Sequence, residues 1–594
     1  MNVFEANISL QVSDFLNSHL KSIESAEKAN QTIYEIFGIT HFFESDEDLH
    51  VLKDIISIPQ NTFKEPDRAE YGDFQTNIEL ADKVASYLIT TNCVPEIVIE
   101  PTCGKGSFIV ASLKHFKGVR KIFGIEIYKP YIWETKFAII EYYLNKPVDT
   151  KLEHNLPIIS IIHSSVFDFD FRTIVKENKT NEILIVGNPP WVTNSKLGAL
   201  NSSNLPKKSN FKNHNGLDAI TGKGNFDIAE YITMMRIETF QFQKGNIALL
   251  VKNTVIKNII FDQNVKKYAV SSFEKHCIDS KKEFNVSVEA ALFFCRLNSK
   301  PTYTCTEFDF YNNLNPKLTF GWLADKFVSN LDTYSNAEQI DGKCPFEWRQ
   351  GIKHDCSSIM EFDKLNGHFV NALKEEFQLE DALVYGILKS SDLKNTVTSV
   401  PRKYTIVTQK RVGQETNYIQ YDYPETYKYL IERKDIFNLR KSSIYNNKPI
   451  FSIFGVGDYS FKPYKVAISG LYKTCRFTLI LPEDGKPIML DDTCYMLGFE
   501  KLEFAVYSLV LLNAETTTQL LQSITFSDAK RTFTKDVLMR IDLLKLAKII
   551  SKSEVQEALN ELNEQYSFDL TLSLWDDFIQ EMTPIKSGQF ELFA

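Results

Sequence analysis

The chain has 594 residues, 43% of them apolar and 13% aromatic, which excludes an extended disordered protein and predicts two or three domains. No apolar stretch approaches the about 18 residues of a membrane helix, the N-terminus lacks a secretory pattern, and nine cysteines and ten histidines are not spaced as zinc ligands. The net charge of −9 excludes a chain that is basic throughout. We therefore expect a cytoplasmic protein with reduced thiols, no membrane segment and no metal site.

Residues 1–70 show the periodicity of amphipathic helices, with apolar side chains at Phe15, Leu16, Leu20 and Ile23. An acidic run follows at residues 44–48. The pattern predicts an N-terminal helical extension that packs against the rest of the protein and carries no chemistry.

Residues 71–300 alternate between short apolar runs and helical stretches. The runs are Ile97–Ile99, Ile122–Ile125, Ile158–Ile162, Ile183–Val186, Ile247–Val251 and Ala290–Phe294. Such alternation is typical of an α/β domain with a doubly wound, Rossmann-like parallel sheet, in which ligands bind at the carboxyl ends of the strands.

A glycine-rich turn follows the first of these runs, in the sequence Glu100-Pro101-Thr102-Cys103-Gly104-Lys105-Gly106. Gly104 and Gly106 allow the backbone to pass close to a nucleoside ligand, and the helix that follows offers free N–H groups. Glu126 ends the next run, where a carboxylate can bind both hydroxyls of a ribose. These features fit a dinucleotide equally well, and we interpret Cys103 as a packing residue.

The most informative motif is Asn188-Pro189-Pro190-Trp191, which follows the run at 183–186 and Gly187. Two prolines stiffen the loop and leave its carbonyls free to accept hydrogen bonds. Asn188 adds a side-chain acceptor and Trp191 a flat apolar face, so the loop suits a planar heterocycle with an exocyclic amine, such as adenine. A rigid turn with a buried Trp is the structural alternative.

Together these motifs resemble the gamma order of N6-adenine DNA methyltransferases, found in bacterial type II restriction-modification systems. The shared pattern is Glu-Pro-x-Cys-Gly-x-Gly-x-Phe, an acidic residue after the second strand, and Asn-Pro-Pro-aromatic. Further segments match in the family's order, at residues 72–76, 224–227, 245–250 and 284–288. The match runs from about Tyr71 to Leu297, and a looser one continues to the C-terminus.

The resemblance implies S-adenosylmethionine as methyl donor and duplex DNA as partner. It implies cofactor contacts from Phe74, Thr76, Glu100, Pro101, Cys103, Gly104, Gly106 and Glu126. It implies catalysis by Asn188, Pro189, Pro190 and Trp191, with Trp191 and Phe284 stacking on a target adenine that has left the helix. The acidic contact to the cofactor adenine is not matched, since Ser165 stands there and Asp168 lies three residues on.

A polar, lysine-containing loop spans residues 192–225 and is expected to close over DNA or to be a disordered insertion. Residues 301–535 are expected to form a mixed α+β target-recognition domain, and 536–594 the closing helices. From Lys389 to Arg476, 16 Lys and Arg stand against 7 Asp and Glu, a balance of +9. Aromatic residues run through this stretch, which suits phosphate and base contacts: Tyr404, Tyr418, Tyr421, Tyr445, Tyr459, Phe461, Tyr464 and Tyr472.

We expect a monomeric adenine-specific DNA methyltransferase that protects DNA from a separate, cognate restriction endonuclease. Three alternatives remain open. Protein-glutamine and RNA methyltransferases use the same loop. A fused endonuclease would need an Asp-x-Lys site, for which Asp392-Leu393-Lys394 and Asp528-Ala529-Lys530 are the candidates. The third is a DNA-binding module without catalysis, against which Asn188 and both glycines argue.

Overall fold

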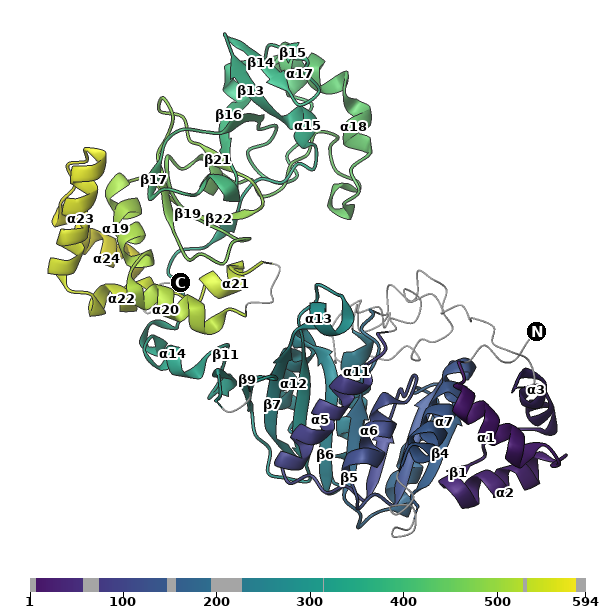
Figure 1. Cartoon of the computed structure of the whole chain (residues 1–594). Coiled ribbons are helices and arrows are strands. Elements are labelled where there is room, and N and C mark those ends of the chain that lie inside the picture. Colours follow the sequence, from purple (N-terminus) through teal and green to yellow (C-terminus); the bar gives the residue numbers. More distant parts are fainter. Residues whose placement is uncertain are drawn as a thin grey trace, which may run out of the picture. The chain divides into compact units, whose positions relative to one another are not determined.

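The computed structural model describes residues 7–56, 74–146, 156–193, 227–312, 315–526 and 531–583 (Figure 1). The chain divides into two compact units, residues 1–327 and 328–594, which are described separately. Several predicted features lie outside the described residues: Gly72, Asp73, residues 224–226, the lysines of the polar loop, and Asp528–Lys530.

The first unit is built on a sheet in which eleven strands are described, in the order β1-β4-β3-β2-β5-β6-β8-β7-β9-β10-β11. Strands β4, β3, β2, β5 and β6 are parallel to one another. Their bounds are Ile158–His163, Lys121–Glu126, Ile97–Glu100, Ile183–Gly187 and Gly245–Lys252. Every residue of β2 and β5 is buried, as expected for central strands covered by helices on both faces.

Helices connect these strands in two directions across the sheet. Helices α6 (Ser107–His115) and α7 (Lys129–Leu144) lead from β2 to β3 and β4. Helices α11 (Ile228–Phe240) and α12 (Asn253–Lys266) lead the other way, from β5 to β6 and β7. Since parallel crossovers are right-handed, the two groups lie on opposite faces, which confirms the predicted doubly wound α/β fold. The strand order reverses between β2 and β5, where a ligand crevice is expected.

The antiparallel part of the sheet extends beyond residue 300. Strand β8 (Ala290–Leu297) lies between β6 and β7 (Val270–Ile278) and is antiparallel to both. Strand β9 (Thr304–Asp309) is parallel to β7, and β10 (Leu318–Leu323) pairs with β9; β11 (Lys326–Val328) ends the order. Residues 301–323, which the sequence placed with the following domain, therefore contribute strands to the first sheet.

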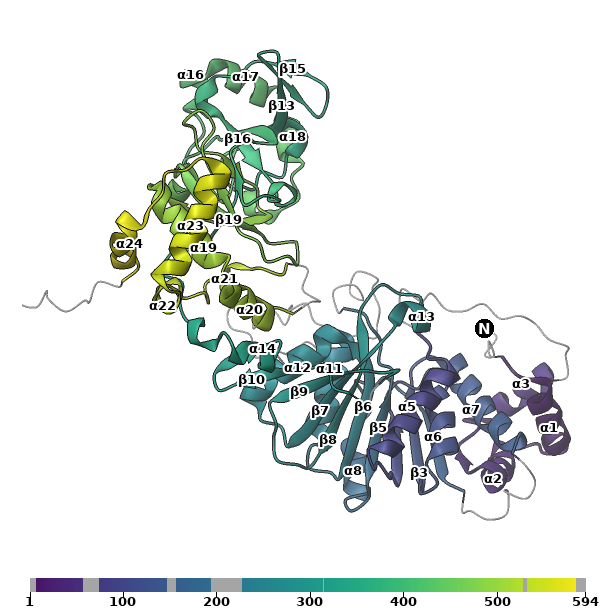
Figure 2. The same ribbon diagram turned by 60° about the vertical axis from the view of Figure 1, so that its left-hand side comes forward.

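The N-terminal segment forms helices α1 (Leu10–Leu20), α2 (Ala26–Phe37) and α3 (Asp46–Ile56), with α5 (Ile78–Thr90) following beside α6 (Figures 1 and 2). The periodicity did not indicate β1 (Ile39–Thr40), which pairs with β4 at the edge of the sheet. The buried Lys136 of α7 donates to the carbonyls of His41 and Phe42, at 3.2 and 2.8 Å. The extension is thus attached both to the sheet and to α7.

The second unit contains two smaller sheets and a group of helices, a mixed α+β arrangement. The five-stranded sheet, in order, comprises β12 (Arg349–Gln350), β22 (Cys494–Phe499), β19 (Tyr464–Ser469), β20 (Thr478–Ile480) and β17 (Val397–Thr398). The six-stranded sheet comprises β15 (Glu376–Phe377), β14 (His368–Asn371), β13 (Glu361–Leu365), β18 (Lys403–Ile406), β16 (Val384–Leu388) and β21 (Met489–Leu490).

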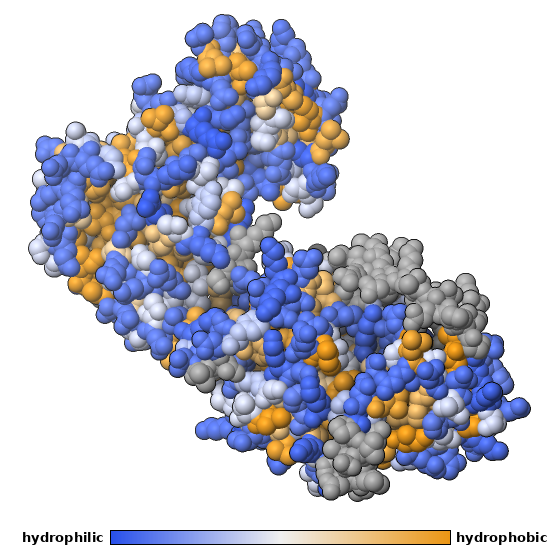
Figure 3. Space-filling view, in the orientation of Figure 1, coloured by the Kyte–Doolittle hydropathy of each residue, from blue (hydrophilic) through white to orange (hydrophobic). Residues whose placement is uncertain are grey.

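Each sheet of the second unit has its own core. The five-stranded sheet packs against α19 (Leu502–Leu512), α20 (Glu515–Ile524), α22 (Leu543–Ile549), α23 (Lys552–Tyr566) and α24 (Trp575–Met582). The six-stranded sheet packs against α15 (Ser357–Met360), α17 (Pro424–Ile431) and α18 (Lys434–Asn438). On the face shown in Figure 3, hydrophobic residues are scattered among hydrophilic ones in both units.

A buried lysine makes the stability of the second unit depend on pH. Lys465 of β19 is fully buried, and its ammonium donates to the carbonyl of Lys462 at 2.7 Å. Burial lowers the pKa of Lys465 to about 7, whereas an unfolded lysine titrates near about 10.4. Between these values the unfolded chain binds more protons, so this group makes the folded state more stable as pH rises.

We therefore expect Lys465→Met to raise the melting temperature near about pH 7, because the variant buries no charge. The advantage of the variant over the parent should shrink as pH approaches about 9. Melting curves of both proteins at several pH values measure this difference. A difference that is constant across the range would show that Lys465 is not the titrating group.

Candidate active site

A cavity that is partly open to solvent lies at the carboxyl ends of β2, β3 and β5. Predicted site residues that line it are Phe74, Thr76, Glu100, Pro101, Cys103, Gly104, Glu126, Asn188, Pro189 and Pro190. Gly106, Trp191 and Phe284 are not among the lining residues. The turn after β2 and the loop after β5 thus meet at the reversal of strand order, although 81 residues separate Gly106 from Asn188 in the chain.

The glycine turn depends on a backbone conformation that other residues adopt at a cost. Gly104 and Gly106 have φ of 52° and 82°, in the left-handed region. A Cβ on Gly104 would lie 2.5 Å from Oε1 of Gln75, so the turn and the segment before α5 are in close contact. Thr135 of α7 donates to the Gly104 carbonyl at 2.8 Å, and Gly106 is the N-cap of α6. The turn is therefore fixed from both sides.

Glu126, the last residue of β3, organises the turn. Its Oε2 accepts from the Gly104 amide at 2.9 Å and its Oε1 accepts from the Tyr128 amide at 2.7 Å. Each carboxylate oxygen can accept a second hydrogen bond, because an ionised carboxylate offers about four lone-pair sites. The residue predicted to hold ribose hydroxyls thus lines the cavity with its orientation fixed by two backbone donors.

Glu100, the last residue of β2, is a buried carboxyl with an unpaired oxygen. The residue is 2% exposed, and its Oε2 has no hydrogen-bond partner among the described residues. Burial raises the pKa of Glu100 well above its usual value, and the nearby charge of Glu126 raises it further. A cationic ligand group in the cavity would remove this penalty by stabilising the ionised form.

The side chain of Asn188 is oriented by the segment before α5. Its Nδ2 donates to the Phe74 carbonyl at 2.7 Å and to Oγ1 of Thr76 at 3.2 Å. Its Oδ1 is buried and has no partner among the described residues. Ser107 of α6 in turn donates to the Thr76 carbonyl at 2.7 Å. Asn188 lines the cavity, and its amide therefore holds a buried, unused acceptor whose direction is fixed by its own donors.

The aromatic residue of the loop lies behind the cavity wall. Trp191 is 6% exposed, and its Nε1 donates to the Leu250 carbonyl at 3.1 Å. Its ring meets the ring of Phe284 edge to face, with centroids 5.0 Å apart, and the ring of Phe74 at 5.5 Å. Trp191 and Phe284 contact each other here, so a base can lie between them only after one ring moves.

Three further sequence expectations concern the cavity wall. Cys103 is buried, and burial raises the pKa of its thiol, so the residue packs as a neutral side chain. Ser165 and Asp168 do not line the cavity; Ser164, Val166 and Phe167 do. The motifs also did not indicate several lining residues: Tyr128, Tyr131, Ile228 and Ile232. Tyr128 could have been found, since it lies two residues after Glu126 and donates to it.

In the second unit, six of the eight predicted aromatic residues are half-buried, and most of these pack against one of its cores. Only Tyr421 and Tyr472 are exposed, at 78% and 51%.

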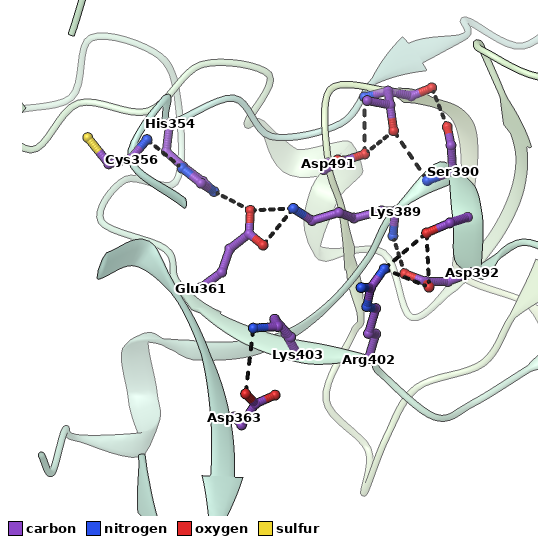
Figure 4. A network of polar contacts seen from close by, with 12 residues as sticks. His354, Cys356, Glu361, Asp363, Lys389, Ser390, Asp392, Arg402, Lys403 and Asp491 are labelled. Atoms are coloured by element: carbon purple, nitrogen blue, oxygen red, sulfur yellow. Dashed lines mark hydrogen bonds and ion pairs between the residues drawn. The ribbon is translucent and has the colours of Figure 1, made fainter. Parts of the chain in front are cut away.

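Asp392 is the acidic residue of the nuclease candidate Asp392-Leu393-Lys394. It accepts a hydrogen bond from the Lys389 amide at 2.8 Å and pairs with Arg402 at 3.6 Å (Figure 4). The described residues contain no group of three or more His, Cys, Asp or Glu that could hold a metal ion. No helix in the described ranges is long and apolar enough to span a membrane.

Known proteins resemble this chain in sequence and in fold. The type II methyltransferase M.NspV of Nostoc sp. (strain ATCC 29411 / PCC 7524) is 40% identical over 499 residues, which cover 82% of this chain and 99% of that protein. The type IIL restriction-modification enzyme MmeI, solved in complex with DNA, matches with a TM-score of 0.56 and 11% identity, over 98% of this chain and 90% of that one. No protein-family model matches. Because the identity to MmeI is only 11%, this likeness shows a shared fold and nothing more.

The buried carboxyl of Glu100, with its one unpartnered oxygen among the described residues, predicts a pH-dependent penalty in the ligand-free protein. Its pKa is raised, so the folded state holds a proton that the unfolded state releases above about pH 4.3, and its contribution to stability falls as pH rises. Glu100→Gln removes this titration while keeping the shape of the side chain. The melting temperature of the variant minus that of the parent should therefore be larger at about pH 8 than at about pH 5. An unchanged difference would mean that Glu100 is ionised throughout.

Proposed function

The chain belongs to the type II methyltransferases of restriction-modification systems, and we propose that it methylates N6 of an adenine in duplex DNA. S-adenosylmethionine is the methyl donor. The observation that carries the adenine assignment is the amide of Asn188, whose donors are engaged and whose buried Oδ1 is an unused acceptor. An exocyclic amine with two hydrogens is the group that such an acceptor beside a second one, the Pro189 carbonyl, would bind.

The cavity fits the methyl donor by its chemistry. Glu126 offers carboxylate oxygens for ribose hydroxyls, and the glycine turn leaves room for the backbone of a nucleoside amino acid. S-adenosylmethionine supplies a methyl group on a positively charged sulfur. Two carboxyls, Glu100 and Glu126, line the same cavity and would favour a positively charged ligand over a neutral one.

The residues of the loop would act on the amine by geometry. The lone pair of N6 is delocalised into the adenine ring, which makes the amine a poor nucleophile. Hydrogen bonds from N6 to Asn188 Oδ1 and the Pro189 carbonyl turn its lone pair out of the ring plane toward the methyl group. The C–N bond forms as the C–S bond breaks, and the surplus N6 proton leaves to solvent, because neither acceptor is basic.

The target base has to leave the duplex to reach this loop. Trp191 is anchored to the Leu250 carbonyl, whereas Phe284 is the last residue of the short helix α13 (Ser280–Phe284). We propose that Phe284 moves away from Trp191 when the base enters, so that the base stacks on the tryptophan ring. A protein or RNA substrate is the alternative for the same loop, and no described feature favours it.

The function is tested most directly at Asn188. Asn188→Ala removes an acceptor that matters most as N6 becomes tetrahedral, so the rate of methyl transfer should fall by at least about a hundredfold. Affinities for cofactor and DNA should change little. Single-turnover transfer of labelled methyl to unmodified plasmid DNA, followed by identification of the methylated base, measures the effect. Methylation of a base other than adenine would refute the proposed specificity.

Asn188→Asp is the matched control, because it keeps an acceptor oxygen and loses the Nδ2 donors. Its residual rate should exceed that of the alanine variant. If the Asn188→Ala variant transferred methyl at the same rate as the parent, the amide would take no part in the reaction.

Thr76 is predicted to position Asn188 as well as to line the cofactor site. Thr76→Val removes the hydroxyl that accepts from Asn188 Nδ2 at nearly constant volume, and Thr76→Ser keeps it. At saturating cofactor, the valine variant should transfer methyl about tenfold more slowly, on the scale of one lost hydrogen bond, and the serine variant at nearly the parental rate. A defect confined to cofactor affinity would assign the hydroxyl to the cofactor alone.

A further inference from the structure

The basic stretch 389–476 contains cations of two kinds, and the first kind is engaged inside the fold. Lys389 pairs with the buried Glu361 at 2.6 Å, and Lys403 of β18 pairs with Asp363 of β13 at 3.5 Å. Figure 4 shows both pairs, together with His354, which lies 3.4 Å from Glu361. These cations connect the strands and turns around the six-stranded sheet. They account for part of the positive balance without serving a partner.

The second kind includes Lys410, Arg411, Lys441 and Lys448, which are exposed and have no acidic partner among the described residues. They come from two segments. Residues 409–414 form a turn that includes Gly413, with φ of 82°, and residues 440–448 follow α18.

The turn 409–414 is held rigidly at its base. Gln409 is fully buried, and its Oε1 accepts from the Ile453 amide at 2.9 Å. Gln414 closes the turn by accepting from the Lys410 amide at 2.8 Å, and Thr408 donates to the Phe451 carbonyl at 2.6 Å. Lys410 and Arg411 therefore project from a turn that is attached to residues 451–453.

The other segment is attached to the same residues through Arg440. Its guanidinium donates to the Ser452 carbonyl at 2.7 Å and to the Ile450 carbonyl at 2.8 Å. It also lies over the ring of Tyr445, 3.7 Å from the centroid. Both segments are thus fixed on residues 450–453, which places the four exposed cations around one short strip of chain.

Exposed apolar side chains accompany these cations. Val412 is 47% exposed and lies in the turn beside Arg411, and Leu439 is 77% exposed beside Arg440. The two segments contain no acidic residue, and the nearest exposed acidic residues along the chain are Glu415 and Asp435, so the four cations keep the local balance positive. Cations interleaved with exposed apolar side chains on a fixed backbone suit phosphate contacts together with apolar contacts in a groove.

We propose that Lys410, Arg411, Lys441 and Lys448 form a DNA-binding patch of the second unit, in which the cations contact backbone phosphates and Val412 and Leu439 contact the groove. The proposal rests on the proposed function for the identity of the partner, duplex DNA, and not on which base is methylated. The rigid attachment matters because side chains on a fixed turn lose less conformational freedom on binding.

The test is charge reversal with a matched control. Two double variants each reverse the charge of one half of the patch: Lys410→Glu with Arg411→Glu, and Lys441→Glu with Lys448→Glu. Lys343→Glu with Lys548→Glu makes the same change of charge at two exposed lysines that, like the cations of the patch, have no acidic partner among the described residues. Binding of unmodified duplex DNA is measured by fluorescence anisotropy over a range of salt concentrations, and cofactor binding by calorimetry.

Each patch variant should bind DNA at least about tenfold more weakly, and its plot of log affinity against log salt should be less steep by about one unit per lost contact. The control should retain parental affinity and slope, and all variants should bind cofactor equally. If the parent binds DNA and the patch variants keep the parental affinity and slope, the proposed patch is wrong, but the proposed function is unaffected. A parent that binds no DNA would instead overturn the proposed function.

Discussion

The amide of Asn188 is fixed by two hydrogen bonds from its nitrogen, and the chemistry proposed for the site depends on this fixation. A buried acceptor without a partner costs about 1–3 kcal/mol in a folded protein. Here the cost is tolerated because Phe74 and Thr76 already occupy both donors, so the amide cannot turn to satisfy its oxygen without losing them. A substrate amine that donates to Oδ1 recovers this free energy on binding.

The fold explains how these groups come together. The strand order reverses between β2 and β5, so the turn after one strand and the loop after the other face the same cavity. Glu126 fixes the turn through the Gly104 amide, and Ser107 fixes the segment at 74–76 through the Thr76 carbonyl. Cofactor residues and the catalytic amide are therefore parts of one hydrogen-bonded structure, which is why we expect Thr76 to affect the rate as well as cofactor affinity.

Local backbone chemistry made much of this site predictable. Glycines in the left-handed region, an acidic strand end and an Asn-Pro-Pro loop each have a structural meaning within a few residues, and the apolar runs predicted the strands of the doubly wound sheet. The partners of Asn188 Nδ2 were not predictable, because Phe74 and Thr76 lie more than a hundred residues away in the chain. The contact between Trp191 and Phe284 was not predictable either, because these residues are also far apart in the chain. The motifs indicated a stacking role toward a ligand for each ring, and not a contact between the two rings.

The same limit applies to charge. The balance of +9 between residues 389 and 476 does not distinguish Lys389, whose partner Glu361 lies outside that stretch, from Arg411, which has no acidic partner among the described residues. Ion pairs form between segments distant in sequence, so a count over a stretch overestimates the charge available to a polyanion. Among the cations that remain after the engaged ones are removed, Lys410, Arg411, Lys441 and Lys448 lie on segments that are held in place by Gln409 and Arg440. Because these segments belong to the second unit and the Asn188 amide to the first, loss of DNA affinity and loss of methyl transfer are separable by substitution.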